Sequence, residues 1–246
     1  MINRIHTLAS TLALTPLLCS TDAYVTCICF IGSKSLSHVL SCIDRCKDRL
    51  MAISSSSSAA QKQIIESVMQ YWKDQPGVGV NIVDKLLNYT ILTPNSVVEW
   101  ALGDSGLKLA EAHVFEMVAS TVQKVTKRVR QIVASRDAPR LPHDQRAMLD
   151  ETLGRERIAM RELFASMEDK LVAWASGSKD QMFDGDGDGM ASEESELVKQ
   201  WGQRWLRVIR RRAAVEEAWL IEIEAAAATQ GSDSNGAGEE GMDTEV

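Results

Sequence analysis

Apolar residues recur at steps of three and four along most of this sequence, and this spacing limits the fold more than any other feature. Between residues 35 and 53 they stand at Leu36, Val39, Leu40, Ile43, Cys46, Leu50 and Ile53. Such a spacing places the apolar side chains on one face of an α-helix. Residues 60–225 are also rich in Ala, Leu, Glu, Lys, Arg, Gln and Met, which favour helix. The sequence therefore predicts an all-α protein.

The first predicted helix ends at a run of five serines, residues 54–58. A second helix over residues 64–72 completes an antiparallel hairpin with it. A third, over residues 80–87, must end before Pro94, because the residue before a proline is forced out of the helical conformation. The fourth helix begins at Ser96, which with Glu99 three residues later has the spacing of a capping box. These two shorter helices form a second hairpin.

The later predicted helices are longer. Apolar residues over 118–132 approach a heptad spacing, and two further helices of about 30 residues each follow over 149–174 and 197–223. Their natural arrangement is a long antiparallel pair. Helical hairpins that cannot bury their apolar faces alone are typical of repeat proteins. The predicted architecture is a HEAT-like α-solenoid of antiparallel helical hairpins, with a long helical pair near the C-terminus.

The two ends of the chain differ from this helical body, which spans residues 33–224. Residues 1–32 lack the helical spacing, and we interpret them as an unrelated leader or an artefact of gene prediction; a secretory signal peptide is the alternative. Residues 225–246 carry five acidic and no basic side chains, so they supply −5 of the net charge of −7. Almost no apolar residue occurs there, and we expect a disordered acidic tail. No segment is long and apolar enough to predict a membrane span.

One loop resembles a calcium-binding motif. Asp184, Asp186 and Asp188, followed by Gly189, match the first six positions of an EF-hand loop. The twelfth position, where a bidentate glutamate is needed, is Ser195. We therefore expect a solvated acidic loop between two long helices and predict no bound metal, with calcium binding as the open alternative.

Two basic stretches and five cysteines are the other candidate groups. The basic stretches are Lys124, Lys127, Arg128, Arg130 and Arg136, and Arg204, Arg207, Arg210, Arg211 and Arg212. Because each alternates with apolar residues at helical spacing, we interpret both as solvated faces, with a phosphate-facing role as the alternative. The cysteines (Cys19, Cys27, Cys29, Cys42 and Cys46) are expected to be reduced, with a zinc site as the alternative. No combination of a nucleophile with a base occurs, so the sequence predicts neither an enzyme nor a cofactor.

Two segments carry a family resemblance. SLSHVLSCIDRCKDRL (residues 35–50) and, more specifically, VDKLLNYTILTPNSVVEWAL (residues 83–102) resemble the C-terminal helical domain of fungal nuclear cap-binding complex large subunits. That family has three HEAT-like domains similar to the middle domain of initiation factor 4G. The resemblance runs over about residues 33–224. Counterparts of the first and middle domains are absent, so we expect the chain to represent part of such a subunit.

The resemblance implies a scaffold that binds the small RRM subunit. In the family, tyrosines of that small subunit stack on the cap guanine, so this chain would contact capped RNA only through the partner and would bind no small-molecule substrate. A nuclear location, shuttling to the cytoplasm, and roles in splicing, export and decay surveillance are implied as well. Partner-facing residues are unassigned, because interface and solvated positions have similar composition. A generic helical adaptor is the rival hypothesis.

Overall fold

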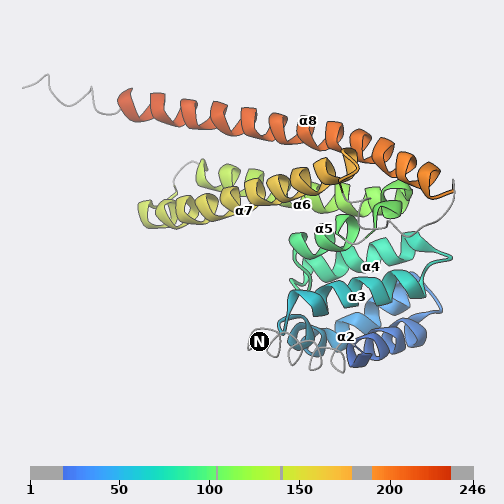
Figure 1. Cartoon of the computed structure of the whole chain (residues 1–246). Helices are drawn as coiled ribbons and strands as arrows, with labels where there is room; N and C mark the ends of the chain where they lie inside the picture. Colours follow the sequence, from blue (N-terminus) through green and yellow to red (C-terminus); the bar gives the residue numbers. More distant parts are fainter. Residues whose placement is uncertain (1–18, 104, 139–140, 179–189, 234–246) are drawn as a thin grey trace, which may run out of the picture.

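The computed structural model describes residues 19–103, 105–138, 141–178 and 190–233. All regular elements within these ranges are helices: one over residues 19–32, then α2 (Leu36–Ser54), α3 (Ser58–Tyr71), α4 (Pro76–Asn88), α5 (Pro94–Leu102), the 3-10 helix η1 (Gly106–Ala110), α6 (Ala112–Arg136), α7 (His143–Ala175) and α8 (Met190–Asp233). Helices α2 to α5 form a stack, and the long helices α6 to α8 lie together at one end of it (Figure 1). The predicted all-α solenoid with a long C-terminal pair is confirmed.

Serine hydroxyls determine where the first two helices of the stack begin. The Oγ of Ser35 accepts a hydrogen bond from the backbone N of His38 at 3.2 Å. Ser57 does the same at the start of α3, where its Oγ accepts from the N of Ala60 at 3.1 Å. A capping hydroxyl satisfies one of the N–H groups that have no partner inside the helix. The serine run therefore ends one helix, as predicted, and also starts the next.

The structure of residues 19–32 contradicts the prediction that this segment lies outside the helical pattern. They are helical, and Val25, Ile28 and Cys29 are buried there with exposed fractions of 3%, 6% and 1%. These three positions have the i, i+3, i+4 spacing of one helix face. A β-branched residue costs only a fraction of a kcal/mol in a helix, which is less than the gain from burying it. The exposed Phe30 and Ile31 hide that spacing in the sequence.

Two contacts join this N-terminal helix to the rest of the stack. The hydroxyl of Ser67 in α3 donates a hydrogen bond of 2.6 Å to Oδ1 of Asp22. At the other end, Gly32 lies so close to α2 that a Cβ atom there would be 2.4 Å from the Cα of Val39. Residues 19–32 are thus an integral layer of the described fold.

The capping residue of α5 corrects a second expectation. The helix begins at Pro94, and Thr93 is its N-cap. Thr93 Oγ1 accepts from the N of Ser96 at 3.2 Å, and Ser96 Oγ accepts from the N of Thr93 at 3.2 Å. The predicted capping box of Ser96 with Glu99 is wrong, because a proline at the first helical position needs no N–H partner and lets the helix start earlier. Glu99 instead forms an ion pair of 2.8 Å with Lys170 of α7.

Helix η1 is where the stack meets the long helices. A Cβ atom on Gly106 would lie 2.3 Å from Cγ1 of Val198 and 3.0 Å from the ring of Trp174. The indole N–H of Trp205 donates a buried hydrogen bond of 3.1 Å to the backbone oxygen of Leu109. Helices α7 and α8 therefore both close onto this short segment.

Helices α7 and α8 are antiparallel, as predicted. Arg210 Nε donates to Oε1 of Glu168 at 2.8 Å, and Arg161 Nε donates to Oε2 of Glu217 at 3.0 Å. The partner of the higher-numbered residue in α8 is thus the lower-numbered residue in α7, as in an antiparallel pair. The hydrogen bond from Arg161 also lowers the pKa of the Glu217 carboxyl. These ion pairs are exposed and contribute little, whereas buried apolar residues supply most of the stability.

Helix α8 is longer than the sequence predicts. It continues to Asp233, whereas the acidic tail is expected to begin at residue 225. Four consecutive alanines, residues 225–228, explain the extension because alanine has the highest helix propensity. Residues 234–246 lie outside the described part of the chain. No described helix, α8 included, has a stretch both long and apolar enough to cross a bilayer.

Candidate functional site

The basic stretch on α6 is mostly neutralised by ion pairs. Four of its five cations lie within 4.0 Å of a carboxylate, namely Lys124 with Asp84, Arg128 with Glu156, Arg130 with Glu216 and Arg136 with Asp137. Lys127 has no such partner among the described residues. These cations join α6 to α4, α7 and α8. The stretch is therefore only in part the solvated face that the sequence suggested.

The basic stretch on α8 is divided between paired and unpaired cations. Arg210 and Arg212 form ion pairs with Glu168 and Glu216, each at 2.8 Å. The guanidinium of Arg204 lies 4.8 Å from the centre of the Trp201 ring, as in a cation–π contact. Within the described ranges, Arg207 and Arg211 are exposed and have no ion-pair partner. Residues 204–212, which contain five arginines and no acid, therefore form a positively charged part of the α8 surface.

A buried carboxylate lies between α6 and α8. Glu216 is 1% exposed, and its Oε2 accepts two hydrogen bonds from Arg130, at 2.9 and 3.2 Å. Arg212 approaches Oε1 to 2.8 Å without hydrogen-bond geometry and donates instead to Oγ1 of Thr126 at 3.2 Å. The Arg130 guanidinium also lies 4.3 Å from the centre of the Trp219 ring. Two arginines thus compensate one buried acid, as burial of a charge requires.

The apolar residues of α8 are only partly in the core. Leu197, Val208 and Val215 have exposed fractions of 44%, 49% and 50%. The buried positions are instead Val198, Trp205, Ile209 and Leu220. The exposed set and the buried set are both helically spaced, so periodicity alone does not separate them. Helix α8 consequently has a second apolar face toward solvent.

A groove of about 330 Å³ lies between α6 and α8 beside that second face. Its apolar walls are Phe115, Val118, Ala119 and Val122 from α6, and Trp205, Val208 and Ile209 from α8; Gln123 and Arg212 are its polar members. Both helices contact α7 more extensively than each other, which leaves the groove open. The rings of Phe115 and Trp205 are nearly perpendicular, at 86°, with 5.0 Å between their centres.

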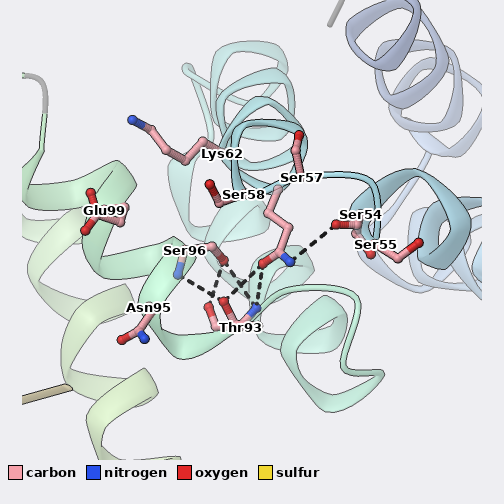
Figure 2. Close-up of a pocket in the computed structure, with 10 residues that line it drawn as sticks. Ser54, Ser55, Ser57, Ser58, Lys62, Thr93, Asn95, Ser96 and Glu99 are labelled. Carbon is pink, nitrogen blue, oxygen red and sulfur yellow. Dashed lines mark hydrogen bonds between the residues drawn. The ribbon is translucent and has the colours of Figure 1, made fainter. Parts of the chain in front are cut away.

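A polar pocket of about 230 Å³ lies where α2, α3 and α5 approach one another (Figure 2). The side chain of Gln61 bridges it: Nε2 donates to the backbone oxygen of Ser54 at 3.4 Å, and Oε1 accepts from the N and Oγ1 of Thr93, each at 3.1 Å. The hydroxyls of Ser54, Ser57 and Ser96 bind backbone groups of their own helix ends. The pocket is therefore a polar joint between hairpins.

The sequence-predicted metal groups are not assembled in the described part of the chain. Asp184, Asp186 and Asp188 lie outside the described residues. Cys29 and Cys42 are buried, and all five cysteines are free thiols. Over the ranges that the structure describes, no three His, Cys, Asp or Glu side chains are close enough to hold a metal ion.

The groove and the Glu216 cluster are the features that sequence reasoning missed. Glu216 has no signal in the sequence, since acids are usually exposed on a helix. Val208 and Val215 lie three and four residues from arginines, but the buried Ile209 also lies three residues from Arg212, so this spacing alone does not identify the exposed positions. Together, a stack of helical hairpins, an open groove and charged surfaces define a helical-repeat scaffold.

The chain belongs to the MIF4G-like family, which matches residues 1–218. It is 26% identical over 113 residues to nuclear cap-binding protein subunit 1 of Schizosaccharomyces pombe, covering 46% of this chain and 14% of that protein. The proteins of the same name from Caenorhabditis briggsae (27% over 110 residues, 43% and 14%) and Xenopus tropicalis (24% over 165 residues, 64% and 21%) are similar as well. The chain therefore spans about a seventh to a fifth of these relatives. The family resemblance inferred from the sequence is confirmed, and with it the prediction of a non-enzymatic scaffold.

Proposed function

We propose that this chain is a scaffold domain of the large subunit of a nuclear cap-binding complex and that it binds the small RRM subunit. The observation that carries the proposal is the similarity to relatives named nuclear cap-binding protein subunit 1 in a yeast, a nematode and a frog. The resembling segment, residues 83–102, ends α4 and forms α5, at the end of the stack that contacts the long helices. A scaffold role also fits a fold whose surface is extended relative to its core.

Capped RNA would reach this chain through the small subunit. Binding to RNA phosphates depends on cations that release counterions from the nucleic acid. Seven of the ten cations in the two basic stretches are already engaged, six with carboxylates and Arg204 with Trp201. The body of the chain is also slightly acidic overall. These properties favour a protein partner over direct RNA contact.

The proposal places the protein in the nucleus, where capped transcripts are made, with shuttling to the cytoplasm as a further expectation. The relatives are named as nuclear proteins. Splicing, export and decay surveillance are the processes in which a subunit of this kind would participate. Each would depend on the assembled complex rather than on this chain alone.

Fluorescence anisotropy with two RNAs of one sequence, capped and uncapped, tests the proposal. The chain alone should not distinguish them, and the chain with the small subunit should retain the capped RNA. Association with the small subunit should be weak for this chain and tighter after the upstream domains of the yeast relative are fused to it, because contacts in a solenoid add up over repeats. Cap discrimination by the isolated chain, or no association even after fusion, would defeat the proposal.

A further inference from the structure

Basic and apolar residues alternate along the solvent-facing stripe of α8. Arg204, Val208, Arg211 and Val215 follow one another at steps of four, three and four, so they share one helix face. The two valines are 49% and 50% exposed, and Phe115 beside the groove is 38% exposed. Large apolar side chains held at the surface next to a groove are typical of a binding surface.

The charge around this groove is positive. Arg130 and Arg212 share the single carboxylate of Glu216, which leaves one net positive charge where the groove ends. The side chains of these two arginines remain 41% and 44% exposed, whereas that of Glu216 is covered. Arg211 adds a charge that has no ion-pair partner among the described residues. A ligand that complements this edge must carry negative charge.

We propose that the α6–α8 groove binds an acidic amphipathic helix of a partner protein. Apolar side chains of that helix would enter the groove beside Val208 and Phe115, and its carboxylates would contact Arg211 and the partly exposed side chain of Arg212. An amphipathic helix fits because it presents apolar anchors at steps of three and four, the same spacing that α8 offers. This inference concerns a surface of the chain itself and does not depend on the proposed role in cap binding.

Single-stranded RNA is a poorer match for the same surface. Bases bind proteins by stacking on open aromatic faces. Trp205 is 2% exposed and packs against Phe115, and the guanidinium of Arg204 lies over the Trp201 ring. The groove walls are otherwise aliphatic. Phe115, 38% exposed, is the one groove-lining ring with substantial exposure, and positive charge beside a single such ring favours carboxylates on a helix over a run of stacked bases.

Peptide display tests the proposal. The library contains random peptides of about 20 residues, which is about five helical turns. The full chain is the target of the selection. Peptides that also bind its Val208→Glu variant are discarded, because they bind outside the groove. Enriched peptides should carry apolar residues at steps of three and four with Asp or Glu between them. A synthesised peptide should bind the full chain and lose about tenfold or more in affinity to Val208→Glu and to Arg211→Glu.

Matched variants keep the result interpretable. Val172→Glu, at a valine of α7 that is 41% exposed and outside the groove, should bind the peptide normally. A peptide with Lys in place of Glu should recover affinity for Arg211→Glu. Circular dichroism confirms that each variant is folded.

Four outcomes would overturn the proposal. They are no enrichment at all, enriched peptides without acidic residues, equal binding by Val208→Glu, and loss of RNA binding rather than peptide binding in Arg211→Glu. Two further outcomes would assign the groove to a different occupant and would therefore also reject the proposal. One is higher peptide affinity after residues 234–246 are deleted, and the other is a self-association that Val208→Glu abolishes.

Discussion

The indole N–H of Trp174, in the last turn of α7, donates a buried hydrogen bond of 2.8 Å to the backbone oxygen of Leu102 at the end of α5. Trp205 of α8 makes the equivalent bond to Leu109 in η1. Both acceptors are main-chain carbonyls near helix ends, where no intrahelical donor is available. Two tryptophans thus attach the long helical pair to the hairpin stack.

Replacing Trp174 by Phe should destabilise the protein by about 2–3 kcal/mol, because the carbonyl of Leu102 would be left buried without a donor. Urea denaturation followed by circular dichroism measures the free energy of unfolding. Trp201→Phe is the control, since that indole is half-buried and donates no hydrogen bond within the described residues. A cost no larger than that of the control would show that the bond contributes nothing.

The capping box of α5 should behave as one unit. Thr93→Ala and Ser96→Ala should each cost about 1 kcal/mol, and the double variant should cost less than their sum, because either change breaks the reciprocal pair. Trp100→Ala in the same helix, where the side chain is 4% exposed, should cost about 3–5 kcal/mol and sets the scale. Strict additivity in the denaturation curves would argue against the reciprocal cap.

Two isoleucines three residues apart test whether residues 19–32 belong to the fold. Ile28 is 6% exposed and Ile31 is 64% exposed. Ile28→Ala should therefore lower the free energy of unfolding by about 2–5 kcal/mol, whereas Ile31→Ala should change it by about 0.5 kcal/mol or less. Thermal melts of the two variants compare them directly. Equal, small effects would support the sequence-based expectation of an unrelated leader.

Helix positions and the order of the hairpins could be predicted from the sequence, because apolar spacing and proline positions act locally. The start of α5 could not, since Thr93 and Ser96 are both good capping residues and only the geometry shows which one precedes the helix. The exposed face of α8 was also missed. Val208 and Ile209 are chemically alike, and their different burial depends on how α6 and α7 pack around α8.

The candidate site, too, could be predicted from the sequence only in part. The basic stretches were visible in the sequence, but their neutralisation by partners such as Asp84 and Glu156 depends on contacts between distant segments. Burial of Glu216 likewise requires two arginines brought together from α6 and α8. Tertiary pairing of this kind leaves no periodic signal.

The thiol of Cys29 should resist alkylation while that of Cys27 reacts. Burial raises the pKa of Cys29 from 9.0 to about 11, whereas Cys27 is exposed. Because the folded pKa lies above the unfolded value, the folded state retains the proton, and the associated stability is present below pH 9.0 and lost as the pH rises to about 11. Mass spectrometry after iodoacetamide treatment at pH 8 locates the labelled residue. Rapid labelling of Cys29 in the folded protein would contradict its burial.

Calcium should bind the loop that contains Asp184, Asp186 and Asp188 no more tightly than about millimolar, because Ser195 replaces the bidentate glutamate of the twelfth position. Isothermal titration calorimetry measures the affinity, and Asp186→Ala is the matched variant. Micromolar binding that this variant abolishes would establish the calcium-binding alternative.

The two tryptophan bonds also bear on the order of folding. They join residues 72 and 96 positions apart in the chain, whereas neighbouring helices of the stack are separated by short turns. Contacts between distant segments form only after the entropy of closing a long loop has been overcome. We therefore expect the hairpins to assemble early and the long pair to dock last. When the protein unfolds, α7 and α8 should be released from η1 before the hairpin stack opens.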